Sequence, residues 1–350
     1  MSAPPKTSPT FTKPQKRWLG IIGLAAILTF FGALLLATYA AVNYKYERAQ
    51  RSDAAPMVFT VPKGAGLSSI ATRLEQNELI DSAFVFKLVT KLRGNEANFK
   101  AGEFLVDPKL SMAGVYDALA NGKAVLYPFT APEGLTSAMI VRSLDGVPTL
   151  IDDDPAVPPE GTLLPETYLT PRGMKQSELL QKMALAQKQL LDDLWDNRAP
   201  NLPIKTRAEA IILASVVEKE TGVGMERGKV AGVFTNRLRI GMRLQSDPTI
   251  IYGVSRGEIL LNKAGKRRGI YRSEIDRKTD WNTYQIDGLP KTAICNPGAD
   301  AIRAVLNPDE TDALFFVADG TGGHAFAKTL AEHERNVAKW RKIERERRQR

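Results

Sequence analysis

Two glutamates, Glu218 and Glu220, end an apolar stretch of the 350-residue chain that reads AIILASVVEKETG. Thr206 and Glu209 form a capping-box pattern just before it, which predicts that a helix begins there. Apolar side chains occupy every direction around this helix, so it should be buried. Glu218 lies over Ile211, whereas Glu220 points to nearly the opposite side. Unless the helix ends between them, the two carboxylates therefore cannot act as the close acid and nucleophile of a retaining glycosidase.

One carboxyl at the end of a buried helix can still act as a general acid. Burial disfavours the ionised form and raises the pKa toward neutrality, which suits proton donation near pH 7. The opposing interpretation is that the helix emerges into solvent at Lys219 and that both glutamates lie on the surface. Lys and Glu at a helix end before a residue such as Gly222 are commonplace.

The sequence offers few residues for metal or thiol chemistry. Cys295 is the one cysteine, so no intramolecular disulfide can form, and no histidine motif accompanies it. His324 and His333 are the two histidines, and neither lies in an H-E-x-x-H pattern. Glycine loops that bind dinucleotides or phosphates are absent as well. We therefore expect no metal and no cofactor.

An uncharged run of 25 residues from Trp18 to Val42 predicts a transmembrane helix, since about 20 apolar residues cross the hydrocarbon. A cleaved signal peptide is the rival, although its apolar core has only about 7 to 15 residues. Four basic and no acidic residues precede the run, and three basic residues mixed with acidic ones follow it. This bias favours a cytoplasmic N-terminus and a single-pass chain whose bulk lies outside the cytoplasm.

The net charge of +9 does not indicate a nucleic-acid-binding protein. Four of the nine charges lie in residues 1–17 and four in residues 341–350, which leaves one for the rest of the chain. A nucleic-acid-binding domain concentrates its charge where it grips phosphates. We expect the two charged ends to be solvated or to contact lipid.

Patterns before residue 126 predict a tail, a membrane helix, a stalk and a small folded segment. Residues 1–17 are rich in Pro, Lys, Ser and Thr and read as a disordered cytoplasmic tail. Residues 43–56 read as a short polar stalk. The folded segment, 57–125, is predicted to contain a strand at 58–61, a turn, a helix from Leu67, a strand at 101–106 and a helix at 111–121.

The larger remainder, 126–340, is expected to form a mixed domain, followed by a basic tail at 341–350. Its patterns predict a strand at 125–130, a helix in PEGLTSAMIVRSL, an irregular acidic and proline-rich stretch at 152–159, two turns within 159–173 and a long helix at 177–195. Strands mixed irregularly with helices indicate an α+β fold and not a doubly wound sheet.

The strand, turn and helix that open residues 57–125 resemble the start of a LysM module, a small fold that binds N-acetylated glycans. The residues that carry this resemblance are Phe59, Val61, Gly64, Leu67, Ile70 and Ala71. The later part of the segment departs from a standard module. Glycan binding and a role as a structural spacer therefore stay open as equal alternatives.

Several long motifs in order resemble the endolytic murein transglycosylases, the MltG or YceG-like family. They are ASVVEKETG, RGKVAGVFTNRLRIGMRLQSDPTIIYG, WNTYQIDGLPKTAICNPGADAIRAVLNP and LFFVADGTGGHAFAKTLAEH. The likeness extends from Met57 to about Trp340. It implies that Glu218, in the V-E-K-E-T motif, is the catalytic residue of a peptidoglycan lyase of the bacterial inner membrane, with its catalytic domain in the periplasm.

The resemblance also implies the chemistry. Glu218 would protonate the glycosidic oxygen between N-acetylmuramic acid and N-acetylglucosamine. The same carboxylate would then take the proton of the muramyl C6 hydroxyl as that oxygen closes on C1, which gives a 1,6-anhydro end without consuming water. The implied partners are peptidoglycan glycan strands, peptidoglycan synthases and the elongation or division machinery.

Seven further polar residues are candidates for binding the sugar. Gln245 and Asp247 precede Pro248 in an expected loop, where they could bond sugar groups or form a turn. Asn282 could supply an amide contact, and Tyr284 could stack on a ring or pack in the core. The remaining candidates are Glu220, Asn236 and Arg237, of which Glu220 could tune Glu218 and Arg237 could orient a carboxylate or lie on a solvated helix face.

Two functions from different classes compete on these patterns. The first is a membrane-anchored endolytic lytic transglycosylase that terminates nascent glycan strands. The alternative is a non-catalytic, membrane-tethered peptidoglycan-binding protein whose working part is the LysM-like segment.

Overall fold

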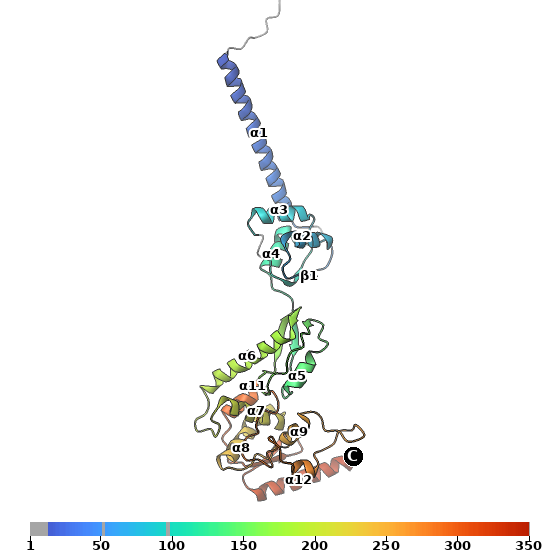
Figure 1. Ribbon diagram of the computed structural model, residues 1–350, viewed down its shortest axis with the longest axis vertical. Coiled ribbons are helices and arrows are strands. Elements are labelled where there is room, and N and C mark those ends of the chain that lie inside the picture. The colour runs from blue at the N-terminus through green and yellow to red at the C-terminus, as the bar shows by residue number, and fades with distance from the viewer. Residues whose placement is uncertain (1–12, 51–52, 96–98, 350) are drawn as a thin grey trace, which may run out of the picture. The chain divides into compact units, whose positions relative to one another are not determined.

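The computed structural model of the protein describes every residue except 1–12, 51–52, 96–98 and 350, and Figure 1 shows its elements. The chain forms two compact units, Met1–Val125 and Leu126–Arg350. Most of the tail expected at residues 1–17 lies outside the described residues. The first helix, α1 (Lys13–Glu47), already includes the last residues of that tail.

Helix α1 contains the expected membrane span. Its segment Ile21–Glu47 is long and apolar enough to cross a membrane. Large apolar side chains such as Leu28, Phe30 and Leu35 are exposed along it, which suits contact with lipid. The length and composition of this helix fit a single-pass anchor.

The end of α1 differs from the stalk predicted at residues 43–56. The helix continues to Glu47, and Tyr46 in its last turn is buried, with its hydroxyl 3.4 Å from Thr90 Oγ1. Arg93 donates hydrogen bonds to Asn43 at 2.8 Å and to Glu47 at 2.6 Å. The start of the expected stalk is therefore packed against the N-terminal unit, because burial of the Tyr46 ring favours the docked helix over a free tether.

The folded part of the N-terminal unit is an antiparallel strand pair with three short helices. The four predicted elements, two strands and two helices, are confirmed, together with the turn after the first strand. The sequence patterns did not predict the third helix, α3. Ser82 caps α3 by accepting a hydrogen bond from the Val85 amide at 3.3 Å. The elements are β1 (Met57–Val61), α2 (Leu67–Gln76), α3 (Ala83–Leu92), β2 (Gly102–Val106) and α4 (Met112–Ala120), and Phe59 of β1 lies opposite Phe104 of β2.

The first half of the C-terminal unit surrounds a small core of its own. The predicted strand, helices and irregular stretch are confirmed, but one of the segments predicted as turns forms a strand, β5. That strand ends at Pro171 and pairs antiparallel in a two-stranded sheet, where a residue without an N–H is tolerated. The elements are β3 (Leu126–Thr130), α5 (Ser137–Leu144), β4 (Leu150–Ile151), β5 (Thr167–Pro171), β6 (Met174–Lys175) and α6 (Gln176–Trp195).

The second half of this unit is built around the buried helix α7 (Arg207–Glu220), which packs against α8, α9 and α11. Its predicted capping box is present, since the Glu209 amide donates to Thr206 Oγ1 at 3.1 Å and the Thr206 amide to Glu209 Oε2 at 3.1 Å. The other elements are η1 (Gly224–Glu226), α8 (Arg227–Arg239), α9 (Asp247–Ser255), α10 (Arg272–Ile275), α11 (Ala299–Leu306), β7 (Phe315–Ala318), β8 (His324–Ala327) and α12 (Leu330–Gln349).

The predicted α+β class is confirmed. Helices provide most of the regular structure, and every sheet among the described residues has two strands, of which only β4 and β6 are parallel. The basic tail expected at residues 341–350 is not a separate element, because α12 continues through it to Gln349.

Candidate active site

Glu218 lies in the last turn of α7, where three segments meet. Its side chain is only 6% exposed. One carboxylate oxygen, Oε1, lies 3.2 Å from Arg227 Nη2, and the other, Oε2, accepts a hydrogen bond from the Gly298 amide at 3.0 Å. The interpretation of Glu218 as a surface residue is therefore wrong. Tertiary packing covers the end of α7, and two donors hold the carboxylate in one orientation.

Arg227 links Glu218 to a second carboxylate. It is the first residue of α8 and its side chain is 12% exposed. The same Nη2 atom lies 3.0 Å from Glu133 Oε2, and Nη1 lies 3.7 Å from Asp300 Oδ2. Sequence reasoning missed both Arg227 and Glu133. The signal that could have found Arg227 was its place at the head of the RGKVAG motif, which begins after the four residues that follow the ASVVEKETG motif of Glu218.

Two glycines allow the chain to approach these carboxylates. A Cβ atom on Gly298 would lie 1.8 Å from Glu133 Oε1, so any other residue there would displace the end of the Glu133 side chain. Gly134 has φ +76°, a conformation that favours glycine, and a Cβ there would lie 3.7 Å from Glu218 Cγ. The backbone next to Glu133 therefore lies directly against the catalytic candidate.

The surroundings of Glu218 shift its pKa in both directions, with a net rise. Burial raises the pKa of Glu218 above its ordinary value, and the nearby charge of Glu133 raises it further. The hydrogen bond from the Gly298 amide and the charge of Arg227 oppose this rise in the pKa. The raised pKa agrees with the one expected from the buried helix, and such a carboxyl can act as a general acid.

Glu220 has different surroundings from Glu218, as their directions on the helix predict. Burial raises the pKa of Glu220 to about 7, and the charge of Asp247 adds to the rise, while His324 and Arg237 oppose it. His324 in turn lies 2.7 Å from Glu226 Oε2 through its Nδ1 atom. The groups that shift Glu220 are therefore distinct from those that hold Glu218.

Asn236 and Arg237 stabilise the fold in this structure. The Asn236 amide donates to the carbonyls of Thr311 at 2.7 Å and Ala313 at 3.2 Å. Arg237 is 7% exposed and donates to the carbonyls of Leu314 at 2.7 Å and Leu244 at 2.6 Å. Arg237 is thus not on a solvated helix face, because these carbonyls and the burial of its stem hold it inside.

Asn282 is also occupied by the backbone. It is 1% exposed, and its amide nitrogen donates to the carbonyls of Glu274 at 3.2 Å, Ile275 at 2.9 Å and Arg277 at 2.6 Å. These bonds use both of its amide hydrogens. Asn282 therefore shapes a loop, and the expected amide contact with a sugar has no donor left.

The other predicted binding residues lie nearer to the surface. Gln245 is exposed and has φ +48°, while Asp247 begins α9 instead of lying in a loop. The carboxylate of Asp247 is favoured there by the helix N-terminus, and it accepts a hydrogen bond from the Tyr284 hydroxyl at 2.8 Å. Gln245 and the Asp247–Tyr284 pair stay candidates for substrate contact.

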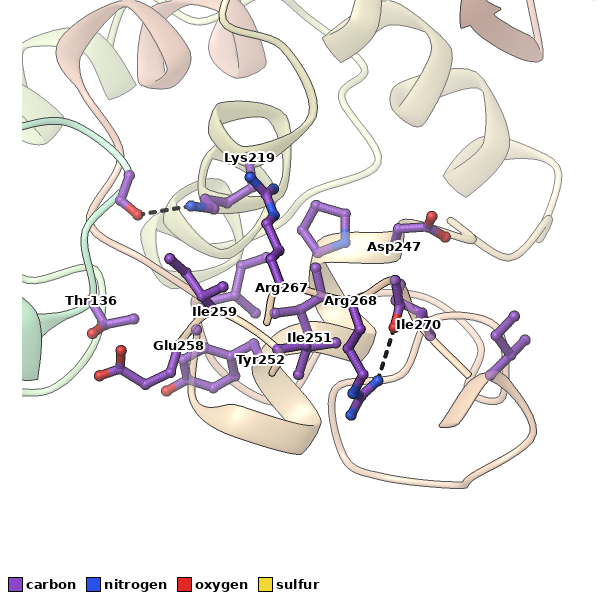
Figure 2. A pocket seen from close by; sticks show the side chains of 17 residues that line it. Thr136, Lys219, Asp247, Ile251, Tyr252, Glu258, Ile259, Arg267, Arg268 and Ile270 are labelled. Atoms are coloured by element: carbon purple, nitrogen blue, oxygen red, sulfur yellow. Dashed lines mark hydrogen bonds between the residues drawn. The ribbon is translucent and has the colours of Figure 1, made fainter. Parts of the chain in front are cut away.

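A cavity of about 790 Å³ opens beside Glu218, and Figure 2 shows the side chains around it. Gly134 lies next to Glu218 in space, and Lys219 follows it in the sequence; both residues line the cavity. Lys219 Nζ donates to the Gly134 carbonyl at 3.2 Å. The cavity therefore begins at the neighbours of Glu218 and extends away from it toward α9 and the loop at 257–270.

The described residues contain no group of three or more His, Cys, Asp and Glu side chains that could hold a metal ion. Cys295 is fully buried, and burial raises the pKa of its thiol well above the ordinary value. A thiol with a raised pKa is a poor nucleophile. Among the described residues, the charged groups that meet at Glu218 are Arg227, Glu133 and Asp300.

Glu218, Arg227 and Gly298 all lie within the part of the sequence that matches one family model. The model of the YceG-like family matches residues 59–339 of the sequence. This chain belongs to the YceG-like family. The family expected from the sequence motifs is confirmed.

The chain is also similar to several bacterial proteins. A Bacillus subtilis (strain 168) protein named endolytic murein transglycosylase is 27% identical over 327 residues, which cover 84% of this chain and 87% of that protein. Two Streptococcus pneumoniae proteins of the same name, from strains D39 and R6, are 26% identical over 360 residues. Those residues cover 89% of this chain but only 64% of the pneumococcal proteins.

A solved structure of a protein described as yceG-like, from Listeria monocytogenes, is also similar to this YceG-like chain. It covers 80% of this chain and 98% of the Listeria chain, at 25% identity and a TM-score of 0.49.

Proposed function

We propose that this YceG-like protein is a membrane-anchored lytic transglycosylase that cuts within peptidoglycan glycan strands. The observation that carries the proposal is Glu218, a buried carboxyl with a raised pKa that is held by Arg227 and the Gly298 amide. Its neighbours Gly134 and Lys219 line an open cavity. The names of the Bacillus and Streptococcus relatives support the same reaction and the same substrate.

In the proposed reaction one carboxyl acts twice. Protonated Glu218 donates its proton to the glycosidic oxygen as the bond from that oxygen to muramyl C1 breaks. The Glu218 carboxylate then removes the proton of the C6 hydroxyl while O6 forms a bond to C1, which gives the 1,6-anhydro end and restores the acid. Arg227 and the Gly298 amide stabilise the carboxylate between the two steps, because both interact with its oxygens.

A second candidate reaction is hydrolysis of the same bond. The observation that favours it is Glu133, a half-exposed carboxylate that shares Arg227 with Glu218 and could activate a water molecule. The non-catalytic, membrane-tethered glycan-binding protein is the third candidate. The products distinguish the three candidates: a lytic transglycosylase gives 1,6-anhydro ends, a hydrolase gives reducing ends, and a binding protein gives no product.

The proposed place of action is the periplasmic face of a bacterial inner membrane. Helix α1 has the length and composition of an anchor, and the basic residues before it favour a cytoplasmic N-terminus. We propose that an enzyme held there shortens nascent strands beside the peptidoglycan synthases and the elongation or division machinery.

The test uses the full-length chain in detergent with purified glycan strands. Mass spectrometry of the products should show 1,6-anhydromuramyl ends, and Glu218→Gln should abolish them because the amide cannot donate the required proton. Glu310→Gln, at an exposed position, serves as the matched control and should cut like the parent. Reducing ends would establish hydrolysis instead, and equal cleavage by Glu218→Gln would refute the assignment of Glu218.

A further inference from the structure

The cavity beside Glu218 has an excess of positive charge that the protein does not neutralise. Lys219 lines it and makes its hydrogen bond to a neutral carbonyl, that of Gly134. Arg267 lines it as well, and within the described part of the chain the structure records no hydrogen bond or ion pair for its guanidinium. Figure 2 shows Arg267 extending toward the side of the cavity where Lys219 lies.

The other charged residues around the cavity are largely compensated. Arg268 forms two hydrogen bonds with Glu274, at 2.7 and 2.8 Å, and Glu258 is paired with Arg142. Within the described residues no cation pairs with Asp247, whose side chain accepts a hydrogen bond from the neutral Tyr284 hydroxyl. Two cations, Lys219 and Arg267, and one carboxylate, Asp247, therefore lie on separate parts of the cavity wall without an ion-pair partner among the described residues.

The rest of the wall is aliphatic. Ile251, Ile259 and Ile270 line the cavity, and Figure 2 shows their side chains around it. The one aromatic residue of the lining, Tyr252, is 6% exposed and packs edge-on against Trp281, with ring centroids 5.6 Å apart. Sugar rings stack on open aromatic faces, and this wall offers none. It suits short alkyl side chains next to charged groups.

We propose that this cavity binds the peptide carried by the lactyl group of the muramyl residue at the cleaved bond. The proposal rests on the proposed function, which places that muramyl residue at Glu218. Such a peptide combines aliphatic side chains with several carboxylates and a free amino group. Its carboxylates match Lys219 and Arg267, its amino group matches Asp247, and its alkyl groups match the isoleucines.

This placement makes the enzyme selective for glycan that still carries its peptides. The cavity wall includes Gly134, where a Cβ would lie 3.7 Å from Glu218 Cγ, and Lys219, the residue after Glu218. We place the peptide of the reacting sugar in this adjacent cavity. Because Arg267 is exposed, solvent screens its charge, and an ion pair with it is worth up to about fivefold in affinity. Peptide-bearing strands should therefore be cut faster than bare ones.

The experiment compares two substrates with the full-length chain in detergent. One is uncrosslinked glycan with intact peptides, and the other is the same glycan after an amidase has removed them. We expect the parent to have the higher kcat/KM on the peptide-bearing strands. Arg267→Glu should lower the ratio of the two kcat/KM values about fivefold, and Arg267→Lys should largely keep it.

Arg272→Ala is the matched control, since Arg272 is an exposed arginine five residues away that pairs with Asp276 and does not line the cavity. Its ratio should equal that of the parent. Equal cleavage of both substrates by the parent, or an equal loss on both substrates in Arg267→Glu, would overturn the peptide site and leave the transglycosylase intact. Cleavage of neither substrate by the parent would overturn the proposed function itself.

Discussion

Replacement of Arg227 by methionine tests whether this cation holds the candidate active site together. In the parent the Arg227 guanidinium lies 3.2 Å from Glu218 and 3.0 Å from Glu133. Methionine has a similar length and an apolar stem, but it has no charge to place between the two carboxylates. Both members of the pair with Glu218 are buried, at 12% and 6% exposure. Breaking a buried pair from one side costs about 3 kcal/mol.

The contribution of Glu133 is smaller because its side chain is 42% exposed and solvent screens the pair, so we assign it less than about 1 kcal/mol. The total loss in the free energy of unfolding should then be about 3 to 4 kcal/mol where Glu218 is ionised. The loss of Arg227 also raises the pKa of Glu218 further, since the arginine charge now lowers it.

The sign of the pH dependence follows from that rise in the pKa. A carboxyl whose folded pKa is raised contributes stability at low pH and loses it as the pH rises through the folded pKa. The deficit of Arg227→Met relative to the parent should therefore be small in acid and large above neutrality. The alkaline limb of kcat/KM, where Glu218 loses its proton, should move to higher pH.

Urea titration of the full-length chain, followed by tryptophan fluorescence at about pH 5 and about pH 8, measures this deficit. Three of the four tryptophans, Trp195, Trp281 and Trp340, lie in the C-terminal unit and report on it. Arg272→Ala should change stability by less than about 0.5 kcal/mol at both pH values. A deficit for Arg227→Met that is absent, or that is the same at both pH values, would refute the reasoning.

Two further outcomes are expected. Gly298→Ala should lower kcat/KM by about tenfold to a hundredfold. It should cost little stability, because its Cβ would displace only the end of the Glu133 side chain. Gly222→Ala is the control and should leave kcat/KM unchanged, because the space around Gly222 is open. In urea titrations the parent should lose stability, on the order of 2 kcal/mol, as the pH rises from about 4.5 to about 7, because the pKa of Glu220 is raised to about 7 in the folded state. Glu220→Gln should not show this loss. A parent and Glu220→Gln with parallel pH profiles would contradict the raised pKa.

Local sequence patterns determine the helices that carry the site. The capping box at Thr206 and Glu209 and the apolar run after it are enough to begin α7 and to bury it. They also decide that Glu218 and Glu220 point apart, because side-chain direction on a helix follows from spacing alone. Long ordered motifs likewise identify the family without any structure.

Side-chain roles were predicted less well where tertiary contacts decide them. Asn236, Arg237 and Asn282 have the chemistry of binding residues, yet each donates to carbonyls that packing brings near it. A buried polar donor needs a hydrogen-bond acceptor, which can be a substrate or a backbone carbonyl. The sequence does not reveal which carbonyls the fold brings close to these donors. The same limit hid β5, whose partner strand lies about 40 residues earlier in the chain.

The sequence alone determined that Glu218 ends a buried helix and belongs to a recognisable motif. Only the tertiary structure decided its partners, because Glu133 lies 85 residues before it and Gly298 lies 80 residues after it. Burial by those segments, and the charge of Arg227 between the carboxylates, set the protonation of Glu218. Desolvation and charge act through space, so a residue's chemistry depends on neighbours that its sequence position does not reveal.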